Sequence, residues 1–354
     1  MGKVLIAMSG GVDSSVAAYL LKHSGWDCVG ATMTLYRNED IGISRSRTCC
    51  SLEDVEDARS VAFRLRIPYY VFNFSDEFRR QVMDRFADAY GQGRTPNPCI
   101  DCNRYLKFRH LYDRAALLGC DTIATGHYAR IERENGRYLL KKALDASKDQ
   151  SYVLYMLTQE QLAHTQFPLG ALHKAETRQL ADSLGFFNAR KPDSQDICFV
   201  PDGDYAAFIR RHSGKADIPG DFVDESGRIL GRHRGIAHYT IGQRKGLGIP
   251  SNRPLYVKAI DPKSNQVVLS GNDALFSQQL TGENFNWIAW EAPPCQFRCS
   301  ARIRYRQTEQ PCKVTVEEDS SVQVLFDRPQ RAITPGQAVV LYDGDTVLGG
   351  GTIL

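Results

Sequence analysis

The sequence lacks a long apolar run, a strong charge of either sign and an amino-terminal secretion signal. No window of its 354 residues holds the about eighteen uninterrupted apolar residues of a membrane span, so we expect no membrane partner. Lys and Arg total 44 and Asp and Glu total 41, and 42% hydrophobic residues exclude disordered and fibrous proteins. The run Lys3–Met8 leads directly into glycines and an aspartate rather than into a signal cleavage site. We therefore expect a cytoplasmic protein.

Cysteine is not scarce, but the chain is too long to be a small disulfide-stabilised scaffold, and we expect it in a reducing compartment. Ten cysteines in a long chain from a reducing compartment favour reactive, metal-binding or buried thiols. Cys28, Cys120 and Cys312 stand in apolar or strand-like contexts, and we expect them to be small hydrophobes of the core. The adjacent pair Cys49 and Cys50 is as readily structural as functional.

Strand and helix signals alternate through the first 200 residues. Apolar runs of strand length occur at Val4–Met8, Cys28–Met33, Tyr69–Phe74 and Thr122–Thr125. Helical patterns lie between them, at 14–23, 51–65 and 105–118. This alternation predicts an α/β fold with a Rossmann-like, doubly wound parallel sheet, helices on both of its faces, and ligands at the carboxyl ends of its strands.

The pattern changes after about residue 205 to short β-rich runs separated by turns. These runs lie at 255–257, 266–269, 314–316, 322–326 and 338–342. We expect an amino-terminal catalytic domain over residues 1–205, a small central β-rich domain over 206–275 and a C-terminal β-barrel over 276–354.

A glycine-rich loop, Ser9–Ser15, separates the first expected strand from the first expected helix. Adjacent glycines let the backbone approach a ligand closely, and the amides and dipole at a helix start attract phosphate. Asp13 can hold the magnesium that accompanies a pyrophosphate. The loop is not a Walker A motif, because no Gly-Lys-Ser/Thr follows. The alternative is a plain strand-to-helix turn capped by Asp13 or Ser14, but this composition at this place favours phosphate binding.

Three further cysteines stand in polar loops. The segment Arg94–Asn103 contains two prolines and leads into a helix that Asn103 could cap, so that Cys99 and Cys102 would lie where the helix dipole stabilises a thiolate. Cys198 stands in a second loop, Asp193–Phe199. A zinc site would need a second Cys-x-x-Cys nearby, which the sequence lacks. Thiols beside a phosphate-binding loop therefore indicate sulfur chemistry.

Seven motifs in order along the chain resemble the tRNA-specific 2-thiouridylases of the PP-loop ATP pyrophosphatase superfamily. They are Ser9–Ser15, Thr95–Asn103, Ala124–Ala129, Lys148–Tyr152, Asp193–Phe199, Tyr239–Gly248 and Arg304–Gln307. The resemblance implies ATP-dependent 2-thiolation of the wobble uridine, position 34 of tRNA. ATP with Mg²⁺ would adenylate the 2-carbonyl oxygen, and sulfur from a cysteine persulfide would then give 2-thiouridine, AMP and pyrophosphate.

The resemblance also implies roles for single residues. Cys198 would carry the persulfide delivered by a sulfur-relay protein, and Cys102 would act as nucleophile or resolving thiol, leaving a Cys102–Cys198 disulfide. ATP would be bound by Ala7, Met8, Ser9, Gly10, Gly11, Val12, Asp13, Ser14, Met33 and Gly126. The tRNA anticodon stem-loop would be bound by Asn97, Pro98, Cys99, His127, Lys148, Asp149, Gln150, Arg304, Tyr305 and Gln337. Some family members have Asp in place of Cys99, and the acid/base role of that carboxylate does not carry over.

Four arginines support a nucleic-acid partner from the pattern alone. Arg298, Arg302, Arg304 and Arg306 share one parity in an expected strand, so they would form a basic stripe able to follow phosphates. The alternative is a solvated face paired with carboxylates. For His127 the alternative is a core histidine, but its place after Gly126 at the end of a strand favours the active site.

Two other classes of protein and one other route for sulfur are also compatible with parts of the sequence. A PP-loop enzyme that transfers nitrogen would need no reactive cysteine. A non-catalytic RNA-binding module with a structural metal would need no Asp13. An iron-sulfur cluster held by Cys99, Cys102 and Cys198 is a rival route for sulfur, which we do not favour.

Overall fold

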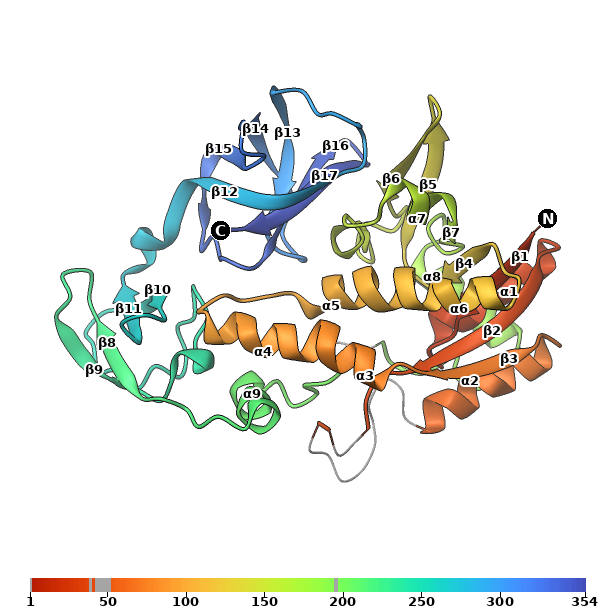
Figure 1. Ribbon diagram of the computed structural model, residues 1–354, viewed down its shortest axis with the longest axis horizontal. Coiled ribbons are helices and arrows are strands. Elements are labelled where there is room, and N and C mark those ends of the chain that lie inside the picture. The colour runs from red at the N-terminus through yellow and green to blue at the C-terminus, as the bar shows by residue number, and fades with distance from the viewer. Residues whose placement is uncertain (1, 38–39, 42–51, 194–196) are drawn as a thin grey trace.

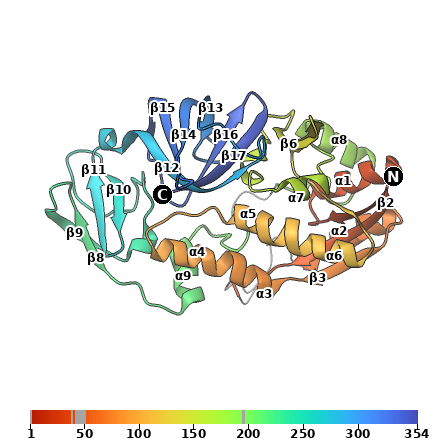
Figure 2. The ribbon, with the colours of Figure 1, turned by 45° about the horizontal axis from the view of Figure 1, so that its top comes forward.

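A computed structural model describes residues 2–37, 40–41, 52–193 and 197–354 of the chain. It is built around three sheets (Figure 1). The parallel sheet lies at one end of the molecule and a four-stranded sheet at the other, and a barrel sits over the long helices that run between them. Figure 2 shows the same arrangement with the barrel turned forward. No helix in the described ranges is long and apolar enough to cross a membrane.

The first sheet is parallel and has the order β3-β2-β1-β4-β7. Its strands are β1 (Lys3–Ala7), β2 (Asp27–Thr34), β3 (Tyr69–Asn73), β4 (Thr122–Thr125) and β7 (Thr165–Gln166). The strand order reverses between β1 and β4. In this architecture ligands usually bind in the crevice at the carboxyl ends of the two strands where the order reverses. Alternating strands and helices of the sequence therefore place the glycine-rich loop at this crevice.

Helices cover both faces of this sheet, as the alternation predicted. One face carries α1 (Val12–His23), α2 (Leu52–Arg64) and α8 (Lys174–Ser183), whose apolar residues form one core with the sheet. The other face carries two longer helical segments and α7 (Gln159–Ala163), which form a second core. The first segment is α3 (Ser75–Phe78), η1 (Arg79–Met83) and α4 (Asp84–Gly91), and the second is α5 (Pro98–Asp101), η2 (Cys102–His110) and α6 (Leu111–Leu117).

The central sheet is small and has its own core. Its order is β10-β11-β8-β9, formed by β8 (Gly220–Val223), β9 (Ile229–His233), β10 (Tyr256–Asp261) and β11 (Gln266–Ser270). Phe222, Val257 and Val267 are fully buried within it. The helix α9 (Tyr205–Ser213) connects it to the first domain, and the short helices η3 (Ser151–Val153), η4 (Ile236–His238) and η5 (Asn272–Leu275) lie in connecting segments.

The C-terminal sheet closes into a barrel, because β12 pairs with both β15 and β17. Its strands are β12 (Phe276–Trp287), β13 (Gln296–Arg302), β14 (Gln310–Val316), β15 (Val322–Arg331), β16 (Ala338–Asp343) and β17 (Thr346–Ile353). A hairpin from the first domain, β5 (Ala129–Glu134) and β6 (Arg137–Lys142), extends this sheet through the pair Thr346 and Lys141. No pattern in the sequence predicted that hairpin.

The predicted fold class is confirmed: a Rossmann-like parallel sheet is followed by a small β-rich domain and a β-barrel. The domain boundaries at 205 and 275 stay a prediction. One local expectation was wrong, since the helix expected to be capped by Asn103 is capped six residues earlier, by Asn97, and starts at Pro98. The pair Cys49 and Cys50 lies outside the described residues.

Candidate functional site

The glycine-rich loop is shaped for close approach by a ligand. Gly10 has φ +74°, and a Cβ at this position would lie 2.3 Å from the carbonyl oxygen of Asp54, so only glycine fits. The Ser14 hydroxyl accepts from the Ser9 amide at 3.1 Å and donates to the Gly11 carbonyl at 3.0 Å. These bonds fix the turn from β1 into α1, and the amino end of α1 faces the crevice with its unpaired amides.

The expected ATP-binding residues converge on this loop from three strands. Ala7 ends β1, the buried Met8 follows it, and Met33 is half-buried near the end of β2. Gly126 follows β4, where a Cβ would lie 2.8 Å from the Ser14 amide nitrogen. The absence of side chains at Gly10 and Gly126 thus lets the loop, β4 and α1 pack closely around the crevice. The residues present suit a nucleoside triphosphate. Its binding stays a prediction.

Asp13, in the first turn of α1, is already well partnered. Its two carboxylate oxygens accept from the Lys174 ammonium at 2.7 Å each, and Oδ1 also accepts from the Tyr128 hydroxyl at 2.9 Å. Lys174 itself is 8% exposed. A magnesium ion on Asp13 would compete with this lysine, and sequence reasoning missed Lys174 because α8 lies 161 residues away.

Asp193 connects this carboxylate to the expected tRNA segment. It accepts from Lys174 and Arg178 through Oδ1 and from Lys148 through Oδ2, each at 2.8 Å. Burial alone would raise the pKa of Asp193, but the hydrogen bonds from Lys148 and Lys174 outweigh it and lower the pKa to about 2. Asp193 is therefore ionised at neutral pH and holds three cations between the glycine-rich loop and the segment that leads to Cys198.

Two residues outside the motifs, both in the segment after α8, brace the loop and α2. The buried Asn188 side-chain amide donates to the Gly10 carbonyl and to the Ser15 hydroxyl at 2.9 Å each. Lys191 donates to Asp54 at 2.6 Å and to Asp57 at 2.7 Å. Neither residue carried a sequence signal, because each acts through contacts that are distant in the chain.

The cysteine-bearing helix starts where Asn97 caps it. The Asn97 side-chain oxygen accepts from the Cys99 amide at 3.1 Å, and Pro98 occupies the first turn. Cys99 is exposed and lies in this first turn, whereas the half-buried Cys102 lies one turn later. The dipole argument thus applies to Cys99 more directly than to Cys102. Asn103 does not cap the helix but is buried and donates to the Val153 carbonyl at 3.0 Å.

Cys198 is half-buried on the segment that follows Asp193. The Tyr36 hydroxyl donates to its backbone carbonyl at 2.7 Å, which ties this segment to the end of β2. Cys102 and Cys198 both pack against the core on the same face of the parallel sheet. Their pairing and their catalytic roles stay predictions.

The three side chains of the expected tRNA segment Lys148–Gln150 bond within the chain. Lys148 pairs with Asp193, as described. Asp149 is buried and accepts from Arg302 of the barrel at 2.9 Å. Gln150 accepts from the Tyr128 amide at 2.9 Å. This segment therefore joins the glycine-rich loop to the barrel, and RNA contacts by these residues stay a prediction.

His127 lies in the core, at 8% exposed, between the rings of Phe108 and Phe167. Its Nδ1 lies 2.7 Å from the Thr125 hydroxyl and its Nε2 lies 3.5 Å from the Lys107 ammonium. Burial, reinforced by Lys107, lowers the pKa of His127 well below its ordinary value, so the ring is neutral at neutral pH. The predicted tRNA contact is untested, and these surroundings are those of the core alternative.

The predicted arginine stripe is wrong. Strand β13 ends at Arg302, so Arg304 and Arg306 leave the strand instead of continuing its face. Arg298 pairs with Asp327 at 2.6 Å, and the largely buried Arg302 pairs with Asp149 and with Glu309. The alternative of a solvated, carboxylate-paired residue therefore holds for Arg298, whereas Arg302 is paired with carboxylates but largely buried.

The other barrel residues of the expected tRNA site lie near loops of the preceding domains. Arg304 donates to the Ala332 carbonyl at 3.0 Å and to the Thr334 hydroxyl at 3.2 Å, and burial lowers its pKa. Tyr305 is partly exposed, and burial raises its pKa. Gln337 donates to the Thr95 carbonyl at 2.7 Å, which fastens the loop before Asn97 to the barrel.

The iron-sulfur alternative requires side chains grouped around a metal. Within the described ranges, no three His, Cys, Asp or Glu side chains are grouped so that they could hold a metal ion. The iron-sulfur alternative through Cys99, Cys102 and Cys198 therefore gains no support from the geometry.

Models of known protein families match almost the whole chain. Three family models match it: a tRNA methyl transferase HUP domain over residues 2–202, a tRNA methyl transferase PRC-barrel domain over 206–271 and an aminomethyltransferase beta-barrel domain over 277–353.

Curated relatives match along their whole length. The chain is 52% identical over 356 residues to the tRNA-specific 2-thiouridylase MnmA of Lachnoclostridium phytofermentans, covering 100% of both chains. It is 54% identical over 354 residues to the tRNA-specific 2-thiouridylase MnmA 1 of a Thermoanaerobacter species, covering 99% of this chain and 97% of the relative. Among solved structures, a 4-thiouridine synthetase in complex with RNA and ATP aligns over 56% of this chain and 45% of its own, with 22% identity and a TM-score of 0.38.

Proposed function

The chain belongs to the tRNA-specific 2-thiouridylase family, and from that premise we propose that it catalyses ATP-dependent 2-thiolation of the wobble uridine of tRNA. The observation that carries the proposal is the match at 52% identity along the whole chain to a relative named for this activity. Two features support it: a glycine-rich loop whose backbone a ligand can approach closely, and two half-buried cysteines that pack against one core.

The chemistry explains why the reaction needs both ATP and thiols. A uridine carbonyl is a poor electrophile because its oxygen is a poor leaving group. ATP, as a substrate, supplies an adenylyl group that converts this oxygen into part of AMP. The amino end of α1 and Lys174 would hold the phosphates while pyrophosphate leaves.

Two cysteines then divide the sulfur transfer between them. Cys198 would accept a persulfide from a sulfur-relay protein and attack the activated carbon through its terminal sulfur. Cys102 would cleave the sulfur–sulfur bond, so that sulfur stays on the base, AMP departs and a Cys102–Cys198 disulfide remains for reduction. The target base must leave the anticodon stack to reach these thiols, and we expect a flipped uridine near Asn97–Cys99.

Incubation with unmodified tRNA, magnesium-ATP and a small-molecule persulfide donor tests the proposal. We expect one thiolated nucleoside per tRNA, at the wobble position, by mass spectrometry of the digested RNA. Cys198→Ser should abolish it and Cys198→Ala likewise, while ATP binding is retained. Incorporation of nitrogen, or full activity of Cys198→Ser, would exclude a thiolase and favour the nitrogen-transferring alternative.

A further inference from the structure

We propose that a cavity between the cysteine-bearing helix and the barrel binds a backbone phosphate of the tRNA substrate through Arg85, Arg94 and Arg104. The inference rests on the proposed function, since it requires an RNA ligand. The cavity has a volume of about 330 Å³, within the size range of ligand-binding pockets. It is distinct from the crevice at the glycine-rich loop.

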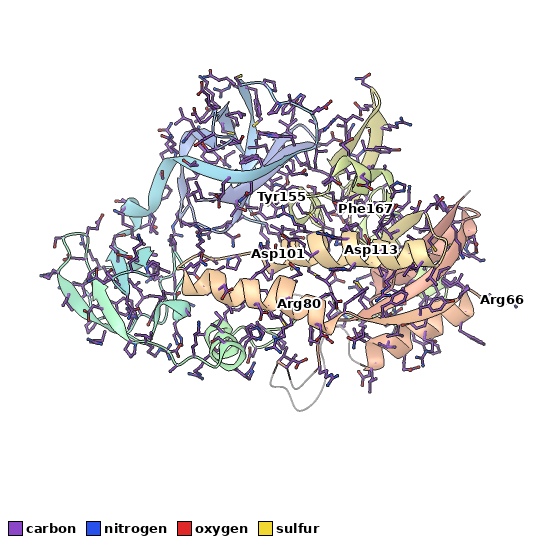
Figure 3. The ribbon with its side chains drawn as sticks, viewed as in Figure 1. Arg66, Arg80, Asp101, Asp113, Tyr155 and Phe167 are labelled. Atoms are coloured by element: carbon purple, nitrogen blue, oxygen red, sulfur yellow. The ribbon has the colours of Figure 1, made fainter. Side chains whose placement is uncertain are left out.

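Three arginines from three different elements line this cavity. Arg85 comes from α4, Arg94 from the loop before α5, and Arg104 from η2. The opposite wall is the barrel, through residues such as Ala338 and Thr352 of β16 and β17. Helices and barrel meet here, and Figure 3 shows Asp101 and Tyr155 close together beneath the barrel. A planar guanidinium fork is the side chain best suited to a phosphodiester.

The three arginines form only long ion pairs, or none, with carboxylates of the described residues. Arg85 approaches Asp101 at 3.4 Å, and Arg94 approaches Glu283 of β12 at 3.9 Å. In the part of the chain that the structure describes, Arg104 has no ion pair, and its guanidinium lies 6.0 Å from the centre of the Tyr105 ring. By contrast, Arg302 of the barrel is held by two carboxylates at 2.9 Å or less. The cavity thus keeps cationic groups available.

The carboxylates in the wall do not cancel this charge. Asp88 and Asp101 are the acidic residues among the lining side chains, against three arginines. Asp101 is already paired with Arg85, and burial raises its pKa although Arg85 and Arg104 act in the opposite direction. The apolar ring of the buried Tyr155 forms part of the wall and strengthens electrostatic attraction there.

The position of the cavity indicates which phosphate it would hold. Asn97, the cap of the helix and the first residue of the expected target-base loop, lines it. The loop is fixed against the barrel by the Thr95 amide, which donates to the Pro335 carbonyl at 2.9 Å, and by Gln337. At Gly336, with φ +89°, a Cβ would lie 3.0 Å from the Arg94 Cβ. Arg94 is therefore held against the cavity beside the loop that would receive the base.

The test is the salt dependence of binding to a fluorescent anticodon stem-loop RNA. Each phosphate contact removed should lower the slope of log affinity against log salt by about 0.7 to 0.9. We expect that decrease, with an affinity loss of about tenfold at low salt, for Arg104→Gln and for Arg85→Gln. Arg104→Lys should keep the slope. Arg66→Gln is the matched control, because Arg66 lies at the far end of the molecule from Asp101 and Tyr155 (Figure 3).

A neutral backbone linkage identifies the phosphate. Stem-loops that each carry one methylphosphonate should bind wild type more weakly at one linkage beside the target uridine, and that linkage should make no difference to Arg104→Gln. An unchanged slope in both arginine variants, or equal methylphosphonate effects in wild type and Arg104→Gln, would overturn the proposal. Thiolation by wild type is scored separately: its absence with the slope effects intact would overturn the proposed reaction and leave the cavity assignment standing.

Discussion

The glycine-rich loop and the arginine segment Arg298–Arg306 both looked like anion-binding sites in the sequence, but only the loop has the expected form in the structure. The loop gets its shape from residues adjacent in the chain, such as Gly10 and Ser14. The arginines of β13 are paired with Asp327 of β15, with Glu309 just before β14 and with Asp149 of the first domain. A local backbone motif therefore predicts its conformation better than a periodic charge pattern predicts a charged surface, because side-chain partners are set by the fold.

The largest expected effect probes the loop side of this comparison. Lys174→Met should lower the rate of thiolation by about 10² to 10³-fold, because Asp13 and Asp193 would then lack their shared cation next to an incoming triphosphate. Single-turnover rates measured at saturating ATP and tRNA would show it. Lys141→Met is the control, since Lys141 also bridges two carboxylates, Glu132 and Glu134, but on the β5–β6 hairpin. A Lys174→Met rate within tenfold of wild type would remove Lys174 from the nucleotide site.

The next effect probes the barrel side with two arginines of one strand. Arg302→Gln should lower the free energy of unfolding by about 3 kcal/mol, because it leaves the buried Asp149 without its cation. Arg298→Gln should change it by at most about 1 kcal/mol, because the Arg298–Asp327 pair is exposed. Urea unfolding followed by tryptophan fluorescence measures both, since Trp287 and Trp290 pack in the barrel. Equal changes would mean that the two pairs do not differ as their burial indicates.

The smallest effect concerns His127, whose core location the sequence left open. The folded state disfavours protonation of this ring, so its contribution to stability is present above the unfolded pKa of about 6.5 and is lost as pH falls below that value. Unfolding free energy should therefore decrease between about pH 6.5 and pH 5 in wild type, and the decrease should be smaller in His127→Gln. Identical pH profiles would contradict a buried neutral histidine.

Sequence reasoning was most reliable where structure is local. It identified β4 at Thr122–Thr125 with the correct limits and α1 from Ser14, two residues after its observed start at Val12. It missed the β5–β6 hairpin, because that hairpin is stabilised partly by β17 of the barrel, whose Thr346 lies more than two hundred residues after its partner Lys141. The same reason explains Lys174 and Asn188, which reach the loop only through the folded chain.

The helix that carries the cysteines shows how a small error in a boundary changes chemistry. Capping by Asn97 instead of Asn103 puts Cys99, not Cys102, in the first turn, where backbone amides remain unpaired. Cys102 instead packs against the core shared with Cys198. The proposed role of Cys102 therefore rests on this shared core rather than on the helix dipole.

Transfer of oxygen from uridine to AMP tests the central claim most directly. With tRNA whose wobble uridine carries ¹⁸O at the 2-carbonyl, adenylation predicts one ¹⁸O in AMP for each thiouridine formed, and none in pyrophosphate. Mass spectrometry of the nucleotide products after a single turnover measures this ratio. Unlabelled AMP, with thiouridine formed in equal amount, would contradict activation of the carbonyl oxygen by ATP.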